Sequence, residues 1–179
     1  MPSMLLHCCC APCAGYVLEI LQPQYDISVL FYNPNIEPYE EYEKRKQEMP
    51  KLLEKASLTS IVPILKCGYD NAAFSDAVLS LRELPEGKER CTVCFELRLK
   101  ETATKAVAGK YDYFATTLTV SPYKDEKVIN EIGCKLENQY GVKYLSSNFK
   151  LNDGYKRSIE LSRSYSLYRQ GFCGCETSV

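Results

Sequence analysis

The sequence is short of net charge, of histidine and of long apolar runs, and these shortages exclude several classes of protein. Its 179 residues hold 22 Lys and Arg against 23 Asp and Glu, a formal net charge of −1. A charge this small gives no overall signature of polyanion binding, so contact with nucleic acid needs a local basic face. No apolar stretch approaches the roughly 20 residues that a membrane-spanning helix requires. We therefore expect no association with a membrane.

The first residues also lack the pattern of a secretory signal peptide. They carry no basic segment, and their apolar run is interrupted after a few positions by cysteines and Pro12. Internal repeats, low-complexity tracts and linkers are absent as well, and 45% hydrophobic residues are enough for one core without disulfides. We expect a single cytoplasmic domain over residues 1–179, where thiols stay reduced.

Strand-like and helix-like segments alternate along the chain. Five apolar segments predict strands at residues 4–9, 26–34, 59–67, 111–119 and 142–149. Six further segments predict helices at residues 13–21, 37–56, 71–81, 91–108, 123–140 and 154–170. Ser121 fits the N-cap of the fifth helix. This alternation indicates an α/β fold with a mostly parallel sheet of about five strands and helices on both faces.

Cysteine is the residue that the sequence has in excess. Its ten cysteines are clustered, unlike the evenly spread cysteines of a small secreted disulfide scaffold. Four of them fall within six positions of the segment MLLHCCCAPCAG: Cys8, Cys9, Cys10 and Cys13. They follow the first predicted strand, and ligands of such sheets bind outside the carboxyl ends of the strands. The cluster therefore lies where we expect an active site.

Some cysteines and the one histidine are expected to be structural. Cys8 still belongs to the apolar strand, which favours a small buried hydrophobe. His7, on the same buried strand, is expected to be a hydrogen-bonded core residue. Cys67 and Cys134 have no partner at a useful spacing.

A Cys-x-x-Cys pair, Cys91 and Cys94, lies in the segment ERCTVCFELR. Three-residue spacing puts both sulfurs on one side of a helical first turn, which suits zinc, a thioredoxin-like dithiol or half of a larger centre. With the N-terminal cluster, four thiolates from two helix starts match a tetrahedral zinc ion or an iron–sulfur cluster. Closing the intervening loop costs on the order of 4 kcal/mol, against roughly 10–16 for structural metal binding. Metal ligation is therefore favoured.

The last cysteines, Cys173 and Cys175, flank one glycine. This spacing allows a small, strained disulfide ring that is readily reduced, which suits a redox relay. Further metal ligands and a tail without function are the alternatives. Upstream of the pair, residues 150–169 carry five basic residues with interleaved tyrosines, the best local candidate for a polyanion face or else a solvated helix face.

Five motifs together resemble the QueH family of epoxyqueuosine reductases. They are LLHCCCAPC, FYNPNIEPYEEYEKR, RCTVCFELRL, FATTLTVSPYK and SLYRQGFCGC, in this order and over essentially the whole chain. The resemblance implies a Rossmann-like fold, a 4Fe-4S cluster and the two-electron reduction of epoxyqueuosine to queuosine at the wobble position of tRNA. An external electron donor is implied as well.

By motif position, the resemblance places cluster ligation on Cys9, Cys10, Cys91 and Cys94. It places a redox-active pair on Cys173 and Cys175, in a predicted tail of residues 170–179. Cys13 is then a fifth thiol that could bind a second metal ion or act near the substrate. Taken with the basic segment, the resemblance also predicts four phosphate-binding residues: Lys156, Arg157, Arg163 and Arg169.

Two functions of other classes also fit the cysteine pattern. One is a zinc-stapled tRNA-binding module without catalysis, and the other is a thiol-disulfide oxidoreductase. An iron–sulfur protein is brown when it is purified without oxygen, whereas proteins of both other classes are colourless.

Overall fold

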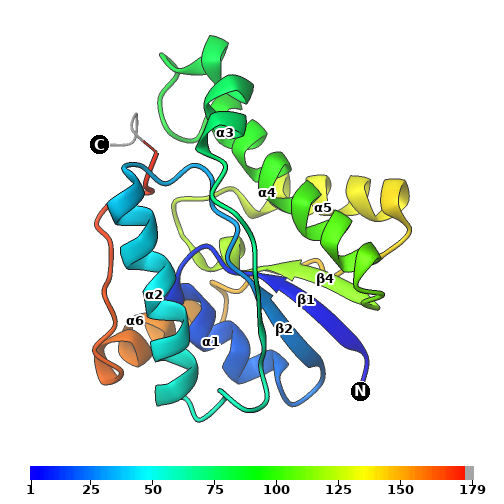
Figure 1. Cartoon of the computed structure of the whole chain (residues 1–179), viewed down its shortest axis with the longest axis vertical. Coiled ribbons are helices and arrows are strands. Elements are labelled where there is room, and N and C mark those ends of the chain that lie inside the picture. Colours follow the sequence, from blue (N-terminus) through cyan, green and yellow to red (C-terminus); the bar gives the residue numbers. More distant parts are fainter. Residues whose placement is uncertain (176–179) are drawn as a thin grey trace.

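The first strand, β1 (Ser3–His7), lies at the centre of a five-stranded parallel sheet of order β3-β2-β1-β4-β5. The computed structural model describes residues 1–175 (Figure 1). The other strands are β2 (Asp26–Leu30), β3 (Ile64–Leu65), β4 (Tyr113–Thr116) and β5 (Lys143–Tyr144). All four outer strands run parallel to β1, which confirms the predicted α/β fold and its parallel sheet.

Helices cover both faces of the sheet, because the buried strands are apolar on both sides. One face packs against α1 (Ala11–Leu21), α2 (Tyr39–Lys55) and α6 (Gly154–Ser164), and the other against α4 (Glu89–Ala108) and α5 (Glu126–Tyr140) (Figure 1). Successive residues of β1 alternate between the two cores: Met4 and Leu6 belong to the first and Leu5 to the second. A short helix, α3 (Asn71–Ala77), and a 3-10 turn, Leu79–Leu81, precede α4.

The segment after β4 differs from the prediction. A 3-10 turn, Thr117–Val120, follows the strand, and α5 begins only at Glu126. Its N-cap is Asp125, not Ser121, since the Asp125 carboxylate accepts hydrogen bonds from the backbone N–H groups of Lys127 and Val128. Residues 121–125 are therefore a loop at the carboxyl edge of the sheet.

The C-terminal segment also differs, because α6 ends at Ser164 and not near residue 170. The chain then runs along α2, where Glu48 accepts a hydrogen bond from the backbone N–H of Tyr168 (Figure 1). Of the predicted tail, residues 176–179 lie outside the described residues. Among residues 1–175, no helix is both long and apolar enough to cross a membrane.

Candidate functional site

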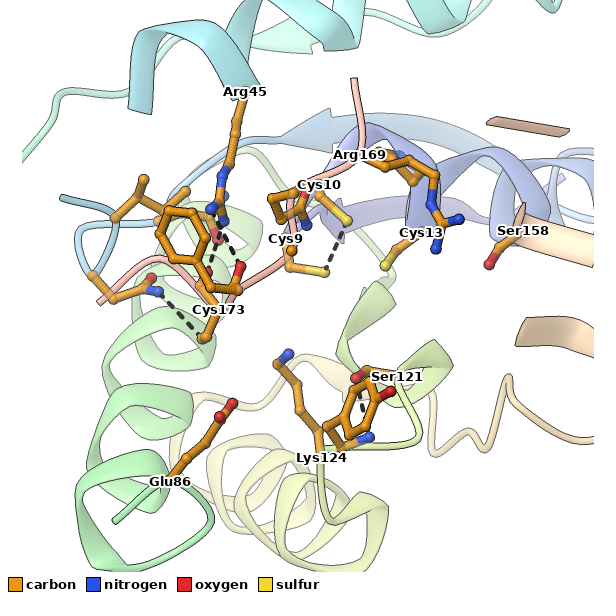
Figure 2. A pocket seen from close by; sticks show the side chains of 18 of the residues that line it. Cys9, Cys10, Cys13, Arg45, Glu86, Ser121, Lys124, Ser158, Arg169 and Cys173 are labelled. Carbon is orange, nitrogen blue, oxygen red and sulfur yellow. Dashed lines mark hydrogen bonds between the residues drawn. The ribbon is translucent and has the colours of Figure 1, made fainter. Parts of the chain in front are cut away.

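Three thiols of the N-terminal cluster converge where β1 passes into α1. Cys10 is the N-cap residue of α1, with extended backbone angles and no side-chain capping bond, and Pro12 occupies the first turn. This turn brings the sulfurs of Cys9, Cys10 and Cys13 within 4.8 Å of one another. Figure 2 shows the three side chains pointing into the same space. Three thiolates at such distances could hold a metal ion. We call these residues the thiol triad.

Hydrogen bonds within the triad favour one thiolate. Hydrogen bonds with Cys10 and Cys13 hold the pKa of Cys9 well below its usual range despite burial. Hydrogen bonds with Cys10 and Cys9, together with burial, raise the pKa of Cys13 well above its usual range. Thr117 contributes from the turn after β4, since its hydroxyl oxygen lies 3.3 Å from the Cys9 sulfur and 3.1 Å from its backbone nitrogen. Cys9 is therefore held from both β1 and β4.

Cys8 and His7 are structural, as predicted. Both are fully buried, and Cys8 belongs to the hydrophobic core. His7 Nε2 donates to the carbonyl of Tyr32 and Nδ1 accepts from the Thr116 hydroxyl, both at 2.9 Å. Burial and the charge of Arg98 lower the pKa of His7 to about 4, so its ring is neutral near pH 7. Neither ring nitrogen is free for a ligand.

Cys91 and Cys94 border a second, smaller cavity of about 50 Å³, which Cys173 and Cys175 also line. Cys91 accepts a hydrogen bond from the backbone N–H of Gly87 at 3.2 Å, while Cys94 is buried beside Cys175. The structure thus places the Cys-x-x-Cys pair next to the C-terminal pair. It places the thiol triad in an adjoining cavity of about 270 Å³, and Cys173 borders both.

The end of the described chain is fixed by Arg45 of α2. Arg45 pairs with Glu41 at 2.6 Å and donates to the carbonyls of Cys173 at 2.7 Å and Phe172 at 3.2 Å. Gly174 has a φ of 120°, and a Cβ there would lie 2.9 Å from Arg45 Nη1, so the position requires glycine. Residues 172–174 are therefore packed against α2.

This placement makes Cys173 the thiolate of the C-terminal pair. A hydrogen bond from Cys175 lowers its pKa well below the usual range, and the charges of Lys124, Arg98 and Arg45 lower it further against the effect of burial. A thiolate is the reactive form of cysteine. Asn35 lies beside it, with Nδ2 4.0 Å from the Cys173 sulfur. The pair is present as free thiols.

Two cations of the site were missed by the sequence analysis. Lys124, in the loop after β4, and Arg98, in α4, border both cavities. Figure 2 shows the Lys124 side chain extending into the space between Cys173 and the thiol triad. Burial lowers the pKa of Lys124, but the charges of Cys173 and Cys9 outweigh it and raise the pKa. Lys124 lies in the motif FATTLTVSPYK and Arg98 in the motif RCTVCFELRL, and these motifs are the features of the sequence that could have pointed to both cations.

Three of the residues that line the larger cavity have a buried polar atom without a hydrogen-bond partner among the described residues. These atoms are Asn35 Oδ1, Arg98 Nη2 and Gln170 Oε1. A buried polar atom without a partner costs about 1–3 kcal/mol. Their gathering in one cavity indicates a site built for a polar ligand.

The predicted phosphate-binding residues have different surroundings. Arg157 pairs with Glu19 at 2.9 Å and with Glu160 at 3.6 Å. Lys156 and Arg163 are exposed on α6, and Arg169 is exposed at the larger cavity, beside Cys13 in Figure 2. One aromatic residue was missed. Tyr123 is 77% exposed and borders both cavities.

The sequence is similar to proteins of the epoxyqueuosine reductase QueH family. The family model described as "Epoxyqueuosine reductase QueH" matches residues 4–179. The protein of that name from Streptococcus pyogenes serotype M1 is 44% identical over 176 residues, which cover 97% of this chain and 69% of that protein. The Staphylococcus epidermidis protein is 43% identical over 178 residues, covering 97% and 75%. The Thermotoga maritima protein is 36% identical over 185 residues, covering 100% and 91%.

Proposed function

The chain belongs to the epoxyqueuosine reductase QueH family, and from this premise we propose that it reduces epoxyqueuosine to queuosine in tRNA through a thiolate-bound iron–sulfur centre. It is an oxidoreductase. One observation carries the proposal: the thiol triad faces a cavity whose other side holds Cys173. A cytoplasmic location, where thiols stay reduced, is part of the proposal.

The chemistry of the donors suits an iron–sulfur cluster, because cysteine sulfurs border both cavities. We assign the four ligands to Cys9 and Cys10 of the triad and to Cys91 and Cys94 of the smaller cavity. Arg98, Lys124 and Cys173 line both cavities, so the two ligand pairs border adjoining spaces. Sulfur is the preferred donor for such clusters, and the nearby histidine is already bonded on both nitrogens. Cys13 remains available for a second metal ion or for the substrate.

Removal of the epoxide oxygen as water leaves an alkene and consumes two electrons and two protons. Cys173 and Cys175 supply both when two thiols become one disulfide: dithiol plus epoxide gives disulfide, alkene and water. When bound, the iron–sulfur cluster passes electrons one at a time. An external donor then returns the disulfide to the dithiol. The Lys124 ammonium extends into the same space, where it stabilises the negative charge that develops on the oxygen.

The mouth of the larger cavity suits an unpaired RNA loop. Arg169 is an exposed cation at its edge, and Lys156 and Arg163 lie on the same C-terminal segment. We propose that these cations contact phosphates, together with Arg157 once it leaves its carboxylate partners. Tyr123 offers a ring on which a base can stack.

The decisive experiment combines metal analysis with turnover. We expect protein purified without oxygen to be brown, to contain iron and sulfide, and to convert epoxyqueuosine in tRNA, as mass spectrometry of the released nucleosides would show. Cys91→Ser and Cys94→Ser should lose iron and turnover. The matched control is Cys134→Ser, an exposed cysteine of α5 outside both cavities, which should keep both. A protein that contains a full complement of zinc, no sulfide and no activity on epoxyqueuosine would instead be a zinc-stapled tRNA-binding module. A colourless, metal-free enzyme active on protein disulfides would identify a thiol-disulfide oxidoreductase.

A further inference from the structure

Arg98 is a buried cation with no carboxylate partner among the described residues, and the groups that it faces are the sulfurs of Cys94, Cys173 and Cys9. It is 2% exposed and forms no ion pair among the described residues. Nε donates to the carbonyl of Cys94 and Nη1 to Asn33 Oδ1, both at 3.4 Å, longer than an ordinary N–H···O bond. Nη2 has no partner. Burial of an unpaired charge is strongly unfavourable, so an anion belongs beside this guanidinium.

The other buried arginines show how this chain normally stabilises such a group. Arg45, equally buried, pairs with Glu41 at 2.6 Å and donates to two backbone carbonyls. Arg90 also forms no ion pair among the described residues and has an unbonded Nη2, but its Nη1 donates to the carbonyls of Leu84 at 2.6 Å and Arg82 at 3.3 Å. Arg98 has neither a carboxylate nor a short bond. Its anion must therefore come from the cavities that it lines.

Beside the thiols, other cations and two carboxylates line the cavities that Arg98 borders. Arg98 and Lys124 border both cavities, and neither forms an ion pair among the described residues. The carboxylates nearby are Glu86, which borders both cavities, and Asp125, which caps α5. Neither bonds to Arg98 in the described structure. Thiolates are thus the anions that this position is built to receive.

We propose that Arg98 is the counter-cation of the thiolate-bound iron–sulfur centre and raises its reduction potential. The inference rests on the proposed function. A cluster held by four thiolates is anionic and gains one more negative charge when one electron enters from the donor, with no bond or proton changed. A nearby cation stabilises the reduced form more than the oxidised form. Arg98 therefore acts through the centre, and it does not act on the substrate.

The test is a redox titration of the holoenzyme with dithionite, followed by electron paramagnetic resonance, without tRNA. Arg98→Met and Arg98→Gln remove the charge, and Arg98→Lys restores it. We expect the neutral variants to shift the reduction equilibrium at least about tenfold toward the oxidised form, a fall of about 59 mV for one electron. Arg98→Lys should recover most of this shift. The matched control is Lys100→Met, which removes one charge from an exposed position of the same helix and should leave the potential unchanged.

The outcomes separate this inference from the proposed function. A merely structural role of Arg98 would lower the melting temperature without moving the potential, and that result would overturn the inference. If Arg98→Met does not fold, the reduction potential of Arg98→Gln decides whether the inference holds. A wild-type protein that shows no redox-active centre would overturn the proposed function and the inference together. A wild-type centre whose potential is the same in the neutral variants would overturn the inference alone.

Discussion

Replacement of Arg45 by methionine should destabilise the protein and release the segment that carries Cys173. Three contacts are lost: the ion pair with Glu41 at 2.6 Å, the bond to the Cys173 carbonyl at 2.7 Å and the bond to the Phe172 carbonyl at 3.2 Å. Arg45 is 2% exposed and Glu41 13%, so solvent screens this pair poorly. Breaking a buried pair costs about 3–5 kcal/mol. For a chain of this size that corresponds to a fall of about 6–20 °C in melting temperature.

The assay is thermal unfolding by circular dichroism, with protein purified without oxygen and matched in iron content. Lys46→Met is the control, because Lys46 lies next to Arg45 but is 46% exposed and makes a looser pair with Glu43 at 3.5 Å. An exposed pair contributes about 0–1 kcal/mol, so this variant should melt close to the wild type. Turnover should fall in Arg45→Met, because Cys173 loses its fixed position.

A second substitution shows whether the pair is the cause. In Glu41→Gln, Arg45 stays buried without its anion, so this variant should also melt lower. The double variant should lose less than the sum of the two single losses, because the same contact is broken in both. Strict additivity, or an Arg45→Met variant that melts like Lys46→Met, would refute the view that Arg45 fixes the C-terminal segment.

Three further predictions concern the thiol pair, the RNA face and the buried histidine. Cys175→Ser should keep the iron and colour of the wild type yet lose turnover; loss of iron would show that the pair are ligands, and full activity would show that the segment is incidental. Reversing the charges of Lys156 and Arg163 should weaken binding of a tRNA anticodon arm and flatten its salt dependence, as measured by fluorescence anisotropy; unchanged affinity and slope would place the face elsewhere. The pKa of His7 is lowered from 6.5 to about 4 in the folded protein, so the unfolded chain binds a proton there first as the pH falls. The free energy of unfolding should therefore be unaffected by His7 above pH 6.5 and should fall by about 3 kcal/mol as the pH drops to 4. His7→Gln should remove this part of the acid destabilisation in urea titrations at several pH values, and an unchanged pH slope would contradict it.

Much of the fold could be predicted because its signals are local. A few neighbouring residues are enough to predict the apolar strand at β1, the periodic helices and the turn at Pro12. These elements place the thiol triad correctly at the carboxyl edge of the sheet. The start of α5 was misplaced because Ser121 and Asp125 are both good N-caps. In the structure Ser121 ends the 3-10 turn after β4 as its C-cap, and Asp125 caps α5.

The cations of the site could not be predicted, because their role depends on contacts far apart in the sequence. In the sequence, Arg98 is an ordinary charged residue within the predicted helix 91–108, and Lys124 is one at the start of the predicted helix 123–140. Only the fold shows that both face Cys173 and that Arg98 is buried without a carboxylate. Arg157 is a related case: the sequence predicts it as a phosphate contact, and only the fold shows that it pairs with Glu19, 138 residues away in sequence.

The position of Cys173 in the wall between the two cavities links whatever occupies them. Binding free energies at two sites of one molecule are reciprocal. If the occupant of the smaller cavity changes the affinity of the larger one for RNA by some factor, RNA changes the affinity of the smaller cavity for its occupant by the same factor. Titrating RNA against protein with the smaller cavity filled and empty therefore measures an interaction carried by the residues that the two cavities share, Cys173 among them.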